Sequence, residues 1–132
     1  MDVGTEFFYE VRETLSDRNC VKIHEERYVV ERVDGDNIYF SVYKDGSLER
    51  DAIGKASYGN GHIRNDRLTK QYEDVIDTRF GEKKVDVMSS DRCGGSTVIY
   101  QSDVVYRFVQ SQMWSGGVIF EQTYDLIHYK IR

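Results

Sequence analysis

Few residues of this chain have the types and spacing that metal binding requires. The three histidines, His24, His62 and His128, are scattered, and none belongs to a His-Glu-x-x-His motif or a paired Cys-x-x-Cys site. His24 and Glu26 would share one face of a strand, as two metal ligands could, although such a pair is more often part of a solvated edge. We therefore expect no metal site and no cofactor.

The glycine-containing loops carry no sharper signal. The stretch Asp34-Gly35-Asp36-Asn37 lacks the later ligands and the terminal glutamate of a calcium loop. The stretch Tyr58-Gly59-Asn60-Gly61 has Gly-x-Gly without the third glycine of a phosphate-binding turn, and no Gly-x-Ser-x-Gly hydrolase motif occurs. We expect that the protein is not an enzyme.

The chain is rich in aromatic residues, with 10 Tyr, 6 Phe and 1 Trp. Because tyrosine is amphipathic, a curved sheet lined with it could hold an apolar molecule and hydrogen-bond its polar end. The alternative is that Tyr and Phe are good strand formers that fill an ordinary core. The candidate ligand-binding residues are Tyr9, Phe40, Tyr106, Phe108, Trp114 and Tyr124. Of these, Trp114 precedes a Ser-Gly-Gly turn and would lie at the rim of a barrel.

The elements that must position these residues are strands, because Gly-centred turn signals separate segments rich in β-branched and aromatic residues. Four such turn signals occur, at residues 34–37, 44–47, 91–96 and 115–117. Apolar alternation predicts about eight strands, at residues 5–14, 20–33, 38–43, 48–56, 78–87, 97–101, 104–109 and 118–131. The sequence therefore predicts a single all-β domain over residues 1–132, an antiparallel meander forming a strongly curved sheet or half-barrel.

Two of these strands change the parity of their apolar residues. In the second, Val21 and Ile23 are odd-numbered whereas Tyr28 and Val30 are even-numbered, which predicts a bulge near residues 25–27. The last strand changes in the same way, which predicts a second bulge near residues 125–126.

The β pattern is lost over residues 57–77. Leu68, Tyr72, Val75 and Ile76 recur at helical spacing behind a possible Asp66 cap, which favours a short helix near residues 66–76. The alternative is a strand over residues 72–80, and the sequence leaves both open.

Charge and hydropathy narrow the class of partner. The chain has 18 Lys and Arg against 23 Asp and Glu, a net charge of -5, and no cationic cluster longer than Lys83-Lys84. Nucleic-acid binding is therefore disfavoured. No apolar run reaches the roughly 20 residues of a membrane-spanning helix, and the N-terminus is unlike a signal peptide. This favours a cytoplasmic protein, or an extracytoplasmic one if a leader was trimmed.

The two cysteines, Cys20 and Cys93, are both beside predicted turns, and two cysteines in a domain of this size define no disulfide framework. We expect them not to be bridged. A bridge would indicate an oxidising compartment.

Four segments, residues 3–11, 28–36, 78–87 and 124–127, resemble a group of uncharacterised β-rich archaeal domains, frequent in methanogens and often exported or lipid-anchored. The resemblance covers most of the chain and consists of strand and turn patterns. It implies a curved, lipocalin-like or lipoprotein-carrier-like sheet with no active site attached.

Two functions from different classes fit this sequence. The first is a binding module that takes a small apolar or amphipathic ligand, or a partner protein, on the concave face of the sheet. The second is a structural or surface-associated interaction domain without a ligand.

Overall fold

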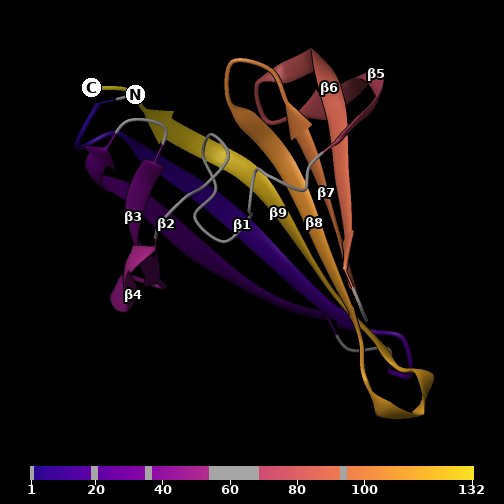
Figure 1. Cartoon of the computed structure of the whole chain (residues 1–132). Helices are drawn as coiled ribbons and strands as arrows, with labels where there is room; N and C mark the ends of the chain where they lie inside the picture. The colour runs from indigo at the N-terminus through magenta and orange to yellow at the C-terminus, as the bar shows by residue number, and fades with distance from the viewer. Residues whose placement is uncertain (1, 19–20, 35–36, 54–68, 93–94) are drawn as a thin grey trace.

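The computed structural model describes residues 2–18, 21–34, 37–53, 69–92 and 95–132. Both cysteines, His62 and residues 66–68 of the expected helix lie outside the described residues, so the expectation about a disulfide stays a prediction. Within them the chain forms one curved antiparallel sheet of nine strands that is not closed, which confirms the predicted fold class (Figure 1).

The strands follow one another with short turns. Their bounds are β1 (Glu6–Leu15), β2 (Val21–Asp34), β3 (Asn37–Lys44), β4 (Ser47–Ile53), β5 (Thr69–Thr78), β6 (Gly81–Arg92), β7 (Gly95–Gln101), β8 (Val105–Met113) and β9 (Ile119–Lys130). The turn between β3 and β4 uses Asp45 and Gly46, whose φ angles of 49° and 87° are those that a tight hairpin demands. This turn confirms the hairpin signal of Asp-Gly.

The order of strands in the sheet is β4-β3-β2-β1-β9-β8-β7-β6-β5, so the first and last strands lie side by side at its centre. Every neighbouring pair is antiparallel, and the edge strands β4 and β5 therefore run in the same direction. Parallel strands cannot be joined by a tight hairpin and need a long crossover connection. This direction explains why the described sheet is an open arc between β4 and β5.

The predicted bulge in β2 near residues 25–27 is wrong. Pairing of β1 with β2 runs without a shift from Glu6 and Val29 to Thr14 and Val21. Val21 and Ile23 instead face outward and are 53% and 57% exposed. The inward positions belong to the even-numbered residues of β2, including the polar His24 and Glu26, and the irregularity of β2 lies between Val30 and Arg32.

The predicted bulge in β9 is confirmed one residue later. Tyr9 pairs with Leu126 and Phe8 pairs with His128, which leaves Ile127 as the extra residue. This insertion moves the inward side from the even-numbered Leu126 to the odd-numbered Tyr129, whose ring lies 6.4 Å from that of Phe7.

The segment left open between helix and strand is the strand β5, which is the ninth strand that alternation did not predict. It is an edge strand, and its Tyr72 and Val75 are more than half exposed while Ile76 is buried. An edge strand with its apolar residues on both faces has no clean alternation, and the helical spacing was accidental.

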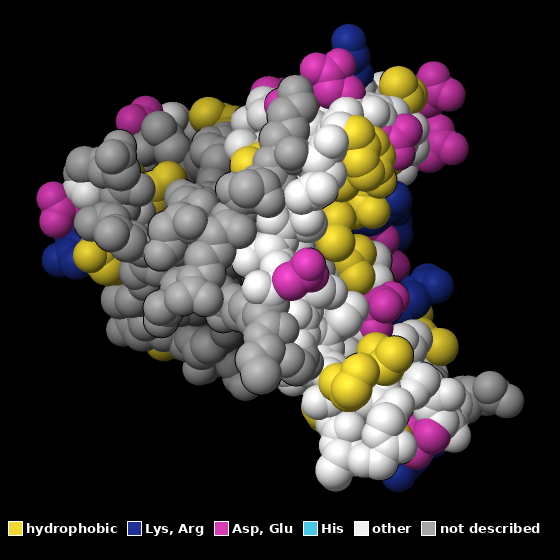
Figure 2. Space-filling view, turned by 45° about the vertical axis from the view of Figure 1, so that its right-hand side comes forward, with side chains coloured by type: hydrophobic (Ala, Val, Ile, Leu, Met, Phe, Trp, Pro, Cys, Tyr) yellow, Lys and Arg dark blue, Asp and Glu magenta, His cyan; other side chains and the backbone are white. Residues whose placement is uncertain are grey.

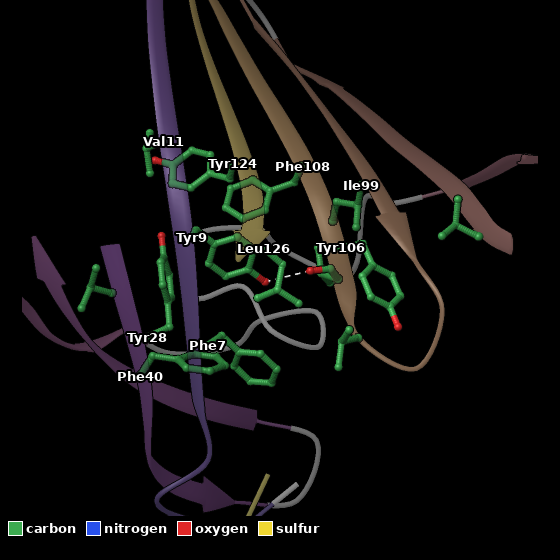
Figure 3. Close-up of a cluster of buried hydrophobic side chains, with 14 of the residues drawn as sticks. Phe7, Tyr9, Val11, Tyr28, Phe40, Ile99, Tyr106, Phe108, Tyr124 and Leu126 are labelled. Atoms are coloured by element: carbon green, nitrogen blue, oxygen red, sulfur yellow. Dashed lines mark hydrogen bonds between the residues drawn. The ribbon is translucent and has the colours of Figure 1, made fainter. Parts of the chain in front are cut away.

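The core lies on the inward face and is built around Tyr9. The Tyr9 ring lies 5.6 Å from Tyr28, 5.4 Å from Phe108 and 6.3 Å from Tyr124, measured between centroids (Figure 3). Its hydroxyl donates to the backbone oxygen of Val105 at 3.0 Å. Because β9 separates β1 from β8, these two strands are about 10 Å apart along the sheet. The side chain of Tyr9 spans β9, which makes this face the concave one.

We predict that Tyr9→Phe lowers the free energy of unfolding by about 1–2 kcal/mol, because the buried Val105 carbonyl loses its donor while the ring packing is kept. The measurement is urea unfolding followed by circular dichroism. Tyr43→Phe, on the half-buried outward side of β3, is the matched control, with an expected change within about 0.5 kcal/mol. Equal losses in the two variants would contradict the proposed span.

Candidate functional site

Five of the six candidate ligand-binding residues are buried in the core. Tyr9, Phe40 and Phe108 are 0% exposed, Tyr124 is 2% exposed and Tyr106 is 3% exposed. The structure brings three of them together: the rings of Phe108 and Tyr124 stack at 4.0 Å, and Tyr9 meets both edge-on. These rings pack against one another, as the core alternative expected.

Phe40, Tyr106 and Trp114 lie away from this triad. Phe40 reaches it through Tyr28, at a ring distance of 6.1 Å. Tyr106 contacts Phe80 at 6.1 Å. Trp114 is 47% exposed and stacks on Phe120 at 5.0 Å, beside the β8–β9 turn. Its place at a rim agrees with the expectation from the sequence.

Below the triad, the inward face carries a row of polar residues that the sequence analysis did not single out. Successive register partners place Ser90, Thr97, Gln110, Gln122 and Glu13 side by side across β6, β7, β8, β9 and β1. We call these five residues the polar row. One step toward the core lie Ile99, Phe108, Tyr124 and Val11, and one step toward the β8–β9 turn lies Phe120. The polar row thus separates the aromatic core from the Trp114–Phe120 pair.

The polar row leads at β1 into a chain of hydrogen bonds on β2. Glu13 accepts from Gln122 at 3.4 Å and lies 3.2 Å from Nδ1 of His24. The Nε2 atom of His24 lies 2.8 Å from Glu26, which also accepts from the Tyr28 hydroxyl at 3.1 Å. The side chains of His24 and Glu26 are 9% and 7% exposed, so this pair is not a solvated edge.

The geometry of this chain decides what it can do. The two carboxylates lie on opposite nitrogens of the imidazole, so the three groups do not converge on one point where an ion could sit. Within the described residues, no group of three or more His, Cys, Asp or Glu side chains is arranged to hold a metal ion. Both contacts of His24 are satisfied together when both ring nitrogens carry protons. The chain therefore holds Glu26 and Tyr28 in place on the concave face.

Two buried polar atoms on this side of the fold have no hydrogen-bond partner. They are the hydroxyl oxygen of Ser90, a residue only 7% exposed, and the side-chain oxygen of Gln101. Ser90 belongs to the polar row, whereas Gln101 lies four residues further along β7 from Thr97, about 13 Å away. An unsatisfied buried hydroxyl costs stability unless a ligand or water completes it.

Sequence reasoning missed Glu13, Ser90, Gln110 and Gln122 because they are polar at positions where the strand alternation calls for apolar residues. A signal existed in β2. His24 and Glu26 share the parity of Tyr28 and Val30, so a reading without a bulge places them inward.

Surface charge gives no competing site. On the face drawn in Figure 2, Lys and Arg side chains stand singly or in small groups among Asp and Glu. The ion pairs are peripheral, for example Arg79 with Glu10 at 3.1 Å and Arg107 with Asp125 at 2.6 Å. A nucleic acid needs a continuous basic face, which this side does not offer.

We predict that His24→Ala lowers the free energy of unfolding by roughly 3 kcal/mol, because it leaves the buried Glu26 carboxylate without its imidazole partner. Chemical denaturation measures the loss. Arg79→Ala, which removes an exposed ion pair, is the control and should cost at most about 1 kcal/mol. The double variant His24→Ala, Glu26→Leu should regain much of the loss. Equal effects of the two single variants would show that the chain on β2 adds no more than a surface pair.

Tyr106 provides a prediction about alkaline pH. Burial, followed by the hydrogen bond from its hydroxyl to Asp103 at 2.8 Å, raises the pKa of Tyr106 above its ordinary value of 10.0. Above pH 10 the unfolded chain loses this proton while the folded one keeps it, so stability falls as pH rises. Tyr106→Phe lacks this group, and the stability gap between wild type and variant should narrow from about pH 8 to about pH 11. A constant gap in urea titrations would contradict the shift.

Among the described residues no helix has the length and hydropathy to span a membrane. Comparisons of the sequence with protein-family models and curated proteins, and with solved structures, found no match, so the likeness to β-rich archaeal domains stays a prediction.

Proposed function

We propose that the concave face of the sheet binds a small amphipathic molecule, with its apolar part against the aromatic core and its polar end on the polar row. No enzymatic step is part of this proposal.

The division of the inward face supports it. Ile99, Phe108 and Tyr124 form an apolar band next to the polar row, and Phe120 and Trp114 form a second apolar group on its other side. Ligand sites in proteins have this composition, mostly aromatic with a few convergent polar groups. Thr97, Gln110 and Gln122 are half-buried, so they are less enclosed than the rings of the core.

The single observation that carries the proposal is the buried Ser90 hydroxyl without a hydrogen-bond partner. Its neighbours Thr97 and Gln110 stand in the same row and face the same way. A polar group bound there would satisfy the hydroxyl, which the described protein atoms do not.

The alternative is an interaction domain without a ligand, and one observation favours it. Tyr9, Phe108 and Tyr124 are fully packed by one another, so the core is complete without a bound molecule. The two proposals differ in whether the concave face takes up a probe.

The test is a titration with the uncharged apolar dye N-phenyl-1-naphthylamine, following both dye emission and Trp114 emission. Trp114 stacks on Phe120, which is two residues, about 7 Å, from Gln122 of the polar row. We expect saturable binding at micromolar dye, a change in Trp114 emission, and stabilisation that reaches about 2.7 kcal/mol at a hundredfold excess over Kd.

Matched variants locate the bound dye. Gln110→Arg puts a long charged side chain on the inward face and should abolish binding, whereas Ser111→Arg, the next residue on the outward face, should not. Near-ultraviolet circular dichroism checks that both variants keep the aromatic core. If neither dye nor Trp114 responds in the wild type, the interaction-domain alternative replaces the ligand proposal.

A further inference from the structure

We infer that the polar end of this ligand is uncharged and both donates and accepts hydrogen bonds, as a hydroxyl or a carboxamide does. The inference rests on the proposed function and names the chemical class that the polar row selects.

An anionic head group is excluded by the charges on the concave face. In the polar row and in the apolar band beside it, none of the described inward positions carries Lys or Arg. Lys22, the register partner of Glu13, is exposed beyond the end of the row. Glu13 and Glu26 add negative charge instead. A carboxylate or phosphate taken from water to this face would find no cation and two repelling groups.

A cationic head group is disfavoured because the two carboxylates already have partners. Glu26 is held by His24 and Tyr28, and Glu13 by His24 and Gln122. An ammonium group would have to displace one of these neighbours. The chain from Gln122 to Tyr28 acts as a completed network at the side of the site.

The remaining polar groups are neutral and amphoteric. Ser90 and Thr97 carry hydroxyls, and Gln110 and Gln122 carry amides, so each can donate and accept. Ser90 is the one whose side chain is buried and unpartnered. A ligand hydroxyl or carboxamide can adapt to either role of the Ser90 hydroxyl, and it loses little hydration compared with an ion.

The experiment is a competition in which four ligands with the same dodecyl chain displace the dye from the wild-type protein. The head groups are the primary alcohol, the primary amide, the amine and the carboxylate, all kept below their micelle-forming concentrations. We expect dodecanol and dodecanamide to displace the dye at concentrations at least about tenfold lower than dodecylamine or dodecanoate. Equal or tighter binding of either charged ligand overturns the inference.

Ser90→Ala tests the recognising group. The affinity for dodecanol should fall about fivefold to tenfold while the affinity for the dye stays unchanged, because only the hydroxyl is lost. The melting temperature of the ligand-free variant should not fall, since that hydroxyl has no partner to lose. Ser111→Ala, on the outward face of β8, should change neither affinity. Unchanged dodecanol affinity in Ser90→Ala overturns the role of Ser90.

The same titrations separate the two levels of the argument. If the dye fails to bind the wild type, the proposed function and the inference fall together. If the dye binds and a charged head group competes as well as the alcohol, the site remains and its selectivity for neutral head groups is rejected.

Discussion

The reach of Tyr9 across β9 to the backbone of Val105 is the contact on which the rest of the structure depends. It joins β1 to a strand that is not its neighbour, which is possible only on the concave side of a strongly curved sheet. The same ring contacts Tyr28 toward one edge of the sheet and Phe108 toward the other, so one side chain fixes the curvature and fills the core. An open sheet has no second layer among its own strands, and curvature is how this one buries a face.

Burying that face has a cost at β2, where Glu26 stands in the inward row. A lone carboxylate at 7% side-chain exposure would be strongly unfavourable. The structure meets this cost with partners from different distances in the chain: Tyr28 and His24 from the same strand, then Glu13 from β1 and Gln122 from β9. The network also ties together the three central strands, at the point where the first and last strands of the chain pair.

How much of this could be read from the sequence depends on how local the determining contacts are. The hairpin at Asp45 and Gly46 and the inward residues of β1 follow from backbone geometry and alternation, and both were predicted. The bulge at Ile127 was placed one residue early, because parity shows that an insertion exists without fixing its position. The face of β2 was assigned wrongly, since the stability of an inward Glu26 comes partly from Glu13, which local patterning cannot reveal. β5 was missed because an edge strand exposes apolar residues on both sides. The candidate aromatic residues were correctly placed inside the sheet, yet the polar row could not be found, because it exists only once the register across five strands is known.

The polar row is the place where the sequence departs from what stability alone would select. Its positions are inward on consecutive strands, between the stacked pair Phe108–Tyr124 and the pair Trp114–Phe120. Apolar residues there would extend the aromatic core to the end of the sheet and bury more apolar surface. Glu13 has a structural reason to be present, since it partners His24. Ser90 has none among the described residues, because its buried hydroxyl meets no partner. Natural proteins keep locally unfavourable residues where function requires them, and this contrast between two members of one row is the physical basis for locating a ligand's polar end at Ser90, well away from the completed chain around His24.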